Sequence, residues 1–141
     1  MNADALDAKM RDYGRERTKG FLLKNLYVVF ATARTHNPEL DQVTLDEAEH
    51  RRVFDAHIAH QLELEASGKL FAAGPLFDKD GNRLGGMIVL RADSFEEAQA
   101  IVDSDPHRTS GLWDHRIERW LVSEGSYTVT IKYSSQTAQI E

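Results

Sequence analysis

The chain has 141 residues and a formal net charge of -6, from 17 Lys and Arg against 23 Asp and Glu. This length suits one domain with a single core, and the acidic balance argues against a nucleic-acid or anionic-membrane partner. The sequence has no cysteine, which excludes disulfides, thiolate nucleophiles and metal sites built on sulfur. Because the best apolar stretch is interrupted by Lys24 and Asn25 and the N-terminus is acidic, we expect no export signal, no membrane span and a cytoplasmic protein.

The first elements can be read from apolar spacing. Residues 2–19 are mostly polar with a narrow apolar stripe at helical spacing, which predicts a short helix in an N-terminal extension, residues 1–20. Residues 22–33 are rich in Val, Phe, Tyr and Leu and predict a buried strand that opens the main domain, residues 21–123. Thr44 and Glu47 have capping-box spacing and predict a helix over about 45–67.

The rest of the main domain continues the alternation of strands and helices. Strands are predicted over 70–76 and 86–91, joined by the turn sequence DKDGN, and Ser94 is predicted to cap a second helix that ends at Pro106. A fourth strand is predicted over 114–123. The order β-α-β-β-α-β is typical of a ferredoxin-like α+β sandwich with an antiparallel sheet. Since both helices lie on one face of such a sheet, we expect a homodimer, or a higher oligomer, formed through the other face.

Two of the histidines on the first helix of this domain, His57 and His60, lie three residues apart, and they are not equivalent. On a helical wheel with Val53 at zero, His57 falls near 40° inside the apolar arc, His60 near -20° at its edge and Glu63 near -80° in solvent. The three side chains therefore fan over roughly 120°, which argues against a metal site, and we expect no metal. His57 points toward the sheet, where it could equally be a core histidine hydrogen-bonded to the backbone.

Four features of the main domain occur together, namely His57, the GKLFAAGP stretch at 68–75, the segment that ends in Asp105 and Pro106, and Gly111. In these features, and over about residues 26–122, the chain resembles the YciI-like (YCII-related) family of small dimeric α+β barrel proteins. The resemblance implies a ferredoxin-like fold, dimerisation through the sheets and an active-site pocket with a His-Asp dyad, which falls on His57 and Asp105. The first twenty residues and the tail after Ser123 depart from the family pattern.

A carboxylate beside an imidazole fixes its orientation and stabilises its protonated form, as a general base requires. The alternative for Asp105 is a helix cap before Pro106, and the two roles are compatible. Gly74 and Pro75 are candidate substrate-binding residues, with a strand end or bulge as the alternative for the glycine. His107 and Arg108 could meet a substrate anion, with solvated surface charge as the alternative.

Two functions remain open at this point. The first is a cofactor-independent enzyme in which His57 moves a proton on a small cyclic or aromatic substrate, in an elimination or isomerisation. The family resemblance supports this, because the wider fold group contains lactone isomerases and dehydrochlorinating lyases. The second is a non-catalytic dimer that binds a small metabolite or serves as an interaction module, with His57 as a buried polar group.

The tail, residues 124–141, is predicted to contain one more strand. Tyr127, Val129, Ile131 and Tyr133 alternate with polar residues, which predicts a strand with one side buried. We expect this strand to cross to the partner subunit. The alternative is a hairpin with the fourth strand of its own chain. Trp113 and Trp120 are expected to be core or interface aromatics.

Overall fold

A computed structural model describes residues 1–34 and 46–140. The chain divides into two compact units, one formed by Asn25–Trp120 and the other by Met1–Lys24 with Leu121–Glu141. No helix within the described ranges is long and apolar enough to cross a membrane.

The unit Asn25–Trp120 is built on a four-stranded sheet with the order β2-β3-β1-β4. Strand β3 runs antiparallel to both β1 and β2. The element order and the strand order confirm the predicted ferredoxin-like α+β sandwich, with a short additional helix before the last strand. The elements are β1 (Lys24–Ala33), α2 (Glu47–Ala66), β2 (Leu70–Phe77), β3 (Arg83–Leu90), α3 (Phe95–Asp103), α4 (Pro106–Thr109) and β4 (Trp113–Val122).

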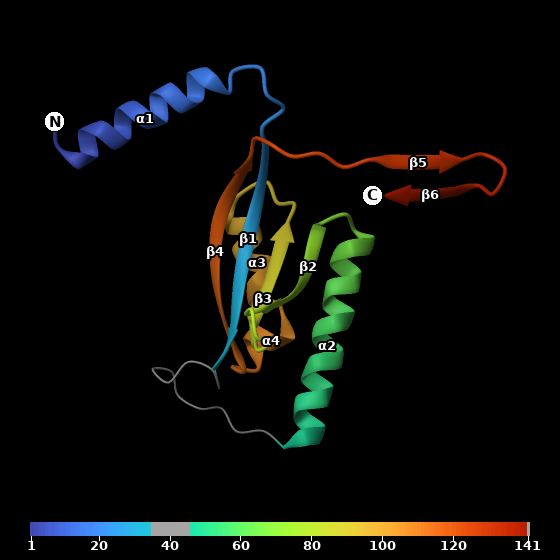
Figure 1. Cartoon of the computed structure of the whole chain (residues 1–141). Coiled ribbons are helices and arrows are strands. Elements are labelled where there is room, and N and C mark those ends of the chain that lie inside the picture. The colour runs from blue at the N-terminus through green and yellow to red at the C-terminus, as the bar shows by residue number, and fades with distance from the viewer. Residues whose placement is uncertain (35–45, 141) are drawn as a thin grey trace. The chain divides into compact units, whose positions relative to one another are not determined.

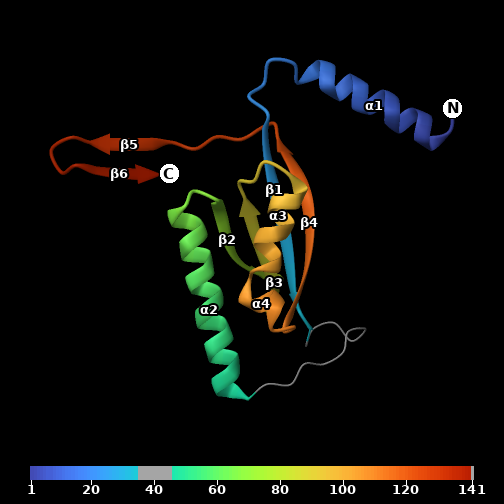
Figure 2. The same cartoon turned by 180° about the vertical axis from the view of Figure 1, so that it is seen from behind.

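The core lies between the sheet and α3. The pairs Tyr27–Leu90 and Val29–Ile88 stand opposite each other on β1 and β3, so these four side chains share one face of the sheet. They pack against Ala98 and Val102 of α3. Figures 1 and 2 show α3 and α4 on this same face, seen from opposite sides.

The other face of the sheet is also apolar. Val28 stands opposite Val89, and Phe30 opposite Met87, on the side away from α3. No described helix of the unit Asn25–Trp120 covers this face in either view, although the Arg116 guanidinium lies 4.7 Å from the centre of the Phe30 ring.

The helix ends follow local hydrogen-bonding signals. Helix α2 begins two residues later than predicted, at Glu47, because its capping box is formed by Asp46 and Glu49. The Asp46 side chain accepts from the Glu49 amide at 2.9 Å, while Thr44 lies outside the described residues. Ser94 caps α3 as predicted, accepting from the Glu97 amide at 3.0 Å.

Strand β3 is longer than predicted, beginning at Arg83 instead of Gly86. The two consecutive glycines at 85 and 86 weaken strand propensity and led to the late start. In the structure Gly85 is required, because a Cβ at this position would lie 2.2 Å from the Ala31 carbonyl oxygen of the neighbouring strand. The close approach of β3 to β1 therefore overrides propensity, and it brings Arg83 into the sheet.

The terminal unit contains α1 (Ala3–Arg17) and a hairpin of β5 (Val129–Lys132) with β6 (Thr137–Ile140). Helix α1 was predicted and has no buried residue. The tail strand was also predicted, and in the single chain its apolar side is exposed, with Ile131 64% and Tyr133 92% exposed. Its partner is β6, which the sequence analysis missed, and not the fourth strand. A crossing to a second subunit stays a prediction.

Candidate active site

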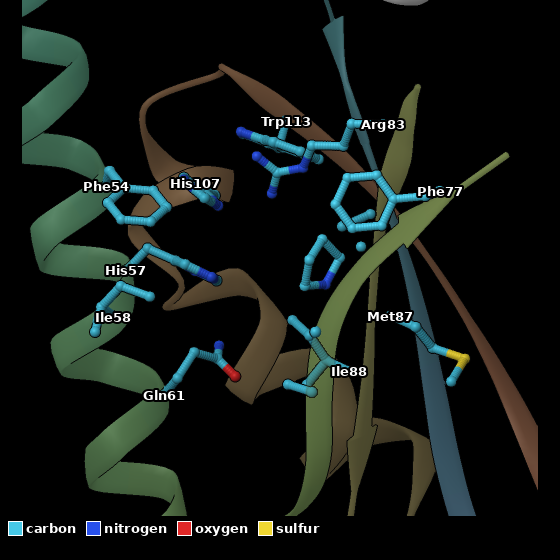
Figure 3. A pocket seen from close by; sticks show the side chains of 15 residues that line it. Phe54, His57, Ile58, Gln61, Phe77, Arg83, Met87, Ile88, His107 and Trp113 are labelled. Atoms are coloured by element: carbon cyan, nitrogen blue, oxygen red, sulfur yellow. The ribbon is translucent and has the colours of Figure 1, made fainter. Parts of the chain in front are cut away.

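A pocket of about 310 Å³ lies between α2 and the strands β2 and β3. Figure 3 shows side chains of α2 on one side of the space and those of the two strands on the other. The lining is mainly apolar and aromatic, and consists of Ala31, Phe54, His57, Ile58, Gln61, Ala73, Gly74, Pro75, Phe77, Arg83, Gly86, Met87, Ile88, His107 and Trp113. A cavity of this size can hold a substituted six-membered ring, since about 150 Å³ is enough for benzene.

The predicted contact between His57 and Asp105 is present. His57 Nδ1 lies 2.8 Å from Asp105 Oδ1 and 3.0 Å from Oδ2. The carboxylate is 2% exposed and the imidazole 15%, so the pair is nearly withdrawn from solvent while the ring still faces the pocket. Gln61, one turn after His57 on α2, donates from Nε2 to Asp105 Oδ2 at 3.2 Å.

Asp105 is at the same time the N-cap of α4. Its Oδ1 accepts from the His107 backbone amide at 2.9 Å, and Pro106 occupies the first helical position. The catalytic and capping interpretations of Asp105 are thus compatible in the geometry.

The charge on Asp105 fixes the tautomer of its partner. Burial alone would raise the pKa of Asp105, but the hydrogen bond and charge of His57 and the His107 amide outweigh it and lower the pKa below its usual value. Asp105 is therefore ionised near neutral pH and can only accept hydrogen bonds. It follows that the neutral form of His57 carries its proton on Nδ1 and has its lone pair on Nε2.

Aromatic rings stack along one wall of the pocket. The rings of His57 and His107 lie 3.8 Å apart at 14°, and those of His107 and Trp113 lie 5.0 Å apart at 19°. His107 is 6% exposed, and burial, together with the nearby His57, lowers its pKa to about 4. His107 is therefore neutral at pH 7 and acts as a flat wall, which argues against the idea that its charge meets a substrate anion.

The cluster of possible metal ligands differs from the one considered in the sequence. Among the described residues, ligand atoms of His57, Asp105 and His107 lie within 4.8 Å of one another. The stacked rings do not suit a shared ion, because an ion between two nearly parallel imidazoles lies outside both ring planes, whereas the nitrogen lone pairs lie in them. His60 is directed elsewhere, with Nε2 3.0 Å from Ser104 Oγ.

The predicted substrate-binding residues divide into two groups. Gly74 and Pro75 line the pocket. Arg108 does not, because its guanidinium donates to Asp114 at 2.9 Å and lies 3.8 Å from Asp103. This geometry corresponds to the alternative of a surface ion pair, and Arg108 has no part in the proposals below.

Three pocket residues were not identified from the sequence. Gln61 falls near 80° on the helical wheel used above, so a polar residue inside the apolar arc was an available signal. Trp113 was assigned to the core or an interface, and nothing in its spacing indicated a ligand pocket. Arg83 fell between the predicted turn and the third strand, because that strand was predicted to start at Gly86.

The fold and the pocket together define a small α+β protein in which a buried carboxylate holds an imidazole at the edge of a ring-sized cavity. The chain belongs to the YCII-related domain family, which it matches over residues 26–120. It is 32% identical over 97 residues to Protein YciI of Escherichia coli O6:H1 (strain CFT073), covering 64% of this chain and 89% of that protein. Protein YciI of Shigella flexneri matches to the same extent, with 32% identity over 64% of this chain and 89% of the relative.

Among the solved structures that align with this chain is the 5-chloro-2-hydroxyhydroquinone dehydrochlorinase (TftG) from Burkholderia phenoliruptrix AC1100, in complex with 2,5-dihydroxybenzoquinone. It aligns with a TM-score of 0.49 and 23% sequence identity, over 67% of this chain and 92% of that chain.

Proposed function

We propose that the protein is a cofactor-independent enzyme that uses His57 as a general base on a small cyclic or aromatic substrate. The observation that carries the proposal is the buried carboxylate of Asp105, 2.8 Å from His57 Nδ1, behind a ring that faces a 310 Å³ pocket. A histidine held in this way presents a basic Nε2 to whatever occupies the pocket.

In the proposed step, Nε2 takes a proton from an acidic C–H or O–H of the substrate, and the electron pair of the broken bond stays on the substrate. In an isomerisation, the imidazolium returns the proton to another atom of the same molecule. In an elimination, the electron pair forms a double bond and a leaving group departs with its own pair. Asp105 keeps the ring oriented and stabilises its positive charge, which makes it a positioning residue.

The pocket also indicates a polar substituent on the substrate. Gln61 is 8% exposed and lines the cavity, and its Oε1 has no hydrogen-bond partner within the described part of the chain. The orientation of the amide follows from its Nε2, which must donate to the Asp105 carboxylate. A buried acceptor without a partner is costly, so a hydroxyl group on the substrate would satisfy it.

Turnover by matched histidine variants tests the proposal. A panel of hydroxybenzoates, hydroquinones and unsaturated lactones is screened for binding by NMR, and each compound that binds is followed in D2O for deuterium incorporation or loss of a leaving group. His57→Asn keeps an amide donor near Asp105 but removes the base, so the rate should fall by about 10²- to 10⁴-fold. Asp105→Asn should lower the rate as well, because the amide no longer fixes the tautomer.

His60→Asn is the control, since His60 lies on the same helix and bonds to Ser104 outside the pocket. Equal rates for wild type and His57→Asn would refute the proposal. Binding of several panel compounds with no turnover of any would instead identify the pocket as a non-catalytic binding site.

We also propose a homodimer formed through the sheet face that carries Val28, Phe30, Met87 and Val89. Support comes from the apolar character of this face and from the lack, within the described part of the unit Asn25–Trp120, of a helix over it. Light scattering after size exclusion should give twice the chain mass at micromolar concentration, and Phe30→Glu should reduce it. A monomer at this concentration would contradict the proposal.

A further inference from the structure

Arg83 lies at the rim of the pocket with its charge facing the cavity. It is the first residue of β3, and its guanidinium carbon is 5.0 Å from the centre of the Trp113 ring. Figure 3 shows this guanidinium at the top of the open space and the ring of His57 at its left edge. Stacking on an indole holds a guanidinium in place while its N–H donors stay free.

The charge of Arg83 has no carboxylate partner among the described residues. Other arginines of the same unit are paired, as Arg108 is with Asp114 and Arg116 with Glu118. Among the described residues that line the pocket there is no Asp, Glu or Lys, so Arg83 carries the one permanent charge of the lining. Burial and the charge of His57 are larger causes of the lowered pKa of His107, and the charge of Arg83 contributes to it as well. The charge of Arg83 is therefore close enough to act on a residue of the pocket wall.

We propose that Arg83 recognises an anionic oxygen group, such as a carboxylate or phenolate, on the ring compound that occupies this pocket. The inference rests on the proposed function and specifies its substrate class. A guanidinium donates two parallel hydrogen bonds to a carboxylate, which fixes both the position and the orientation of the ligand. With the anion at Arg83, the ring extends across the cavity toward His57.

The same residue would act on the reaction itself. When His57 takes a proton from the substrate, negative charge moves onto a substrate oxygen. A fixed positive charge at the pocket rim stabilises that oxyanion. Arg83 thus selects the anionic substrate and also stabilises the negative charge that develops during the reaction.

Binding of two matched probes tests the proposal without turnover. Benzoate and benzamide share one shape and differ in charge, and their dissociation constants are measured by NMR titration of the wild type and of Arg83→Met, Arg83→Lys and Arg116→Met. The wild type should bind benzoate on the order of tenfold more tightly than benzamide. Arg83→Met should bind benzoate and benzamide equally. Arg83→Lys should keep part of the preference for benzoate, because lysine retains the positive charge but cannot donate two parallel hydrogen bonds.

Arg116→Met is the matched control, because it removes a charge of the same kind from the same sheet. Arg116 lies over the Phe30 ring and does not line the pocket. Arg116→Met should keep the full preference. The preference of the wild type should also shrink as salt is raised, since Arg83 is exposed.

Three results would overturn the proposal: a benzoate preference that survives in Arg83→Met, an equal loss of it in Arg116→Met, or no benzoate binding at millimolar concentration. His57→Asn separates this proposal from the catalytic one. If that variant and the wild type prefer benzoate equally but the wild type turns nothing over, anion recognition stands and the proposed function fails.

Discussion

Helices α1 and α3 start from similar local signals but end in different environments. Each begins at a residue whose side chain caps the first turn, Asn2 for α1 and Ser94 for α3, and each carries apolar residues at helical spacing. Helix α3 buries Ala98 and Val102 against the sheet, whereas α1 buries no residue. Capping and periodicity therefore specify that a helix forms, but the surface that faces it decides whether it contributes to the core.

The strands show the same contrast. The alternating residues of β1 and β3 are enclosed by α3, while the alternating residues of β5 remain exposed. We therefore expect substitutions in the unit Asn25–Trp120 to change global stability and those in the terminal unit to change it little.

The largest expected effect comes from two glycines, one in each unit. Gly85→Ala places a Cβ 2.2 Å from the Ala31 carbonyl oxygen, so β1 and β3 must separate, and the free energy of unfolding should fall by about 3 kcal/mol or more. Gly14→Ala adds a Cβ in the last turn of α1, with no atom within 4 Å beyond its chain neighbours and the backbone of its own helix. It should raise the helicity of α1 and leave the urea midpoint unchanged. Similar urea midpoints for Gly85→Ala and Gly14→Ala would refute the contrast in stability between the two units.

The next effect concerns acid stability within the packed unit. The folded pKa of His107 is lowered from 6.5 to about 4, so the unfolded chain takes up a proton at a higher pH than the folded one. Stability should therefore fall as pH drops below 6.5 and level off near 4, by up to about 3 kcal/mol. His107→Phe keeps a flat ring and should remove this part of the slope in urea unfolding between pH 7 and 4.5. His50→Gln, at an exposed position of α2, should not.

A smaller effect is expected from the tail. Tyr127, Val129, Ile131 and Tyr133 are exposed in the single chain, and a second copy that covers them would gain from their burial. Removal of residues 126–141 should weaken self-association by at least about tenfold, seen as a fall in mass at low micromolar concentration. A truncated chain that remains a tight dimer would show that the sheet faces are sufficient and that the hairpin does not cross.

The smallest effect concerns His115 of β4. Burial lowers the pKa of this histidine, and neither ring nitrogen has a hydrogen-bond partner within the described residues. His115→Leu removes two unsatisfied polar atoms and should raise the free energy of unfolding by about 1 kcal/mol. His50→Leu, made at the exposed position, controls for the gain in apolar character. A loss of stability in His115→Leu would indicate that the ring is hydrogen-bonded, for example to water.

Much of the fold was predictable because its signals are local. The apolar run of β1, the Asp-Gly turn and the Ser94 cap each depend on neighbours within a few residues. The pair His57 and Asp105 required more, since the helical wheel gave the direction of His57 but only the family resemblance supplied its partner, 48 residues away. Arg83 and Trp113 could not be predicted, because their convergence depends on the approach of β3 to β1 at Gly85, which no local pattern encodes.

The double role of Asp105 has a consequence for local opening. The His107 amide donates to Oδ1 of the same carboxylate that holds His57 Nδ1, at 2.9 Å and 2.8 Å respectively. This amide can exchange its hydrogen with solvent only when the first turn of α4 releases the carboxylate. Its exchange rate, read by NMR in the resting protein, therefore measures how often the cap that helps to hold the Asp105 carboxylate beside His57 opens, with no substrate needed for the measurement.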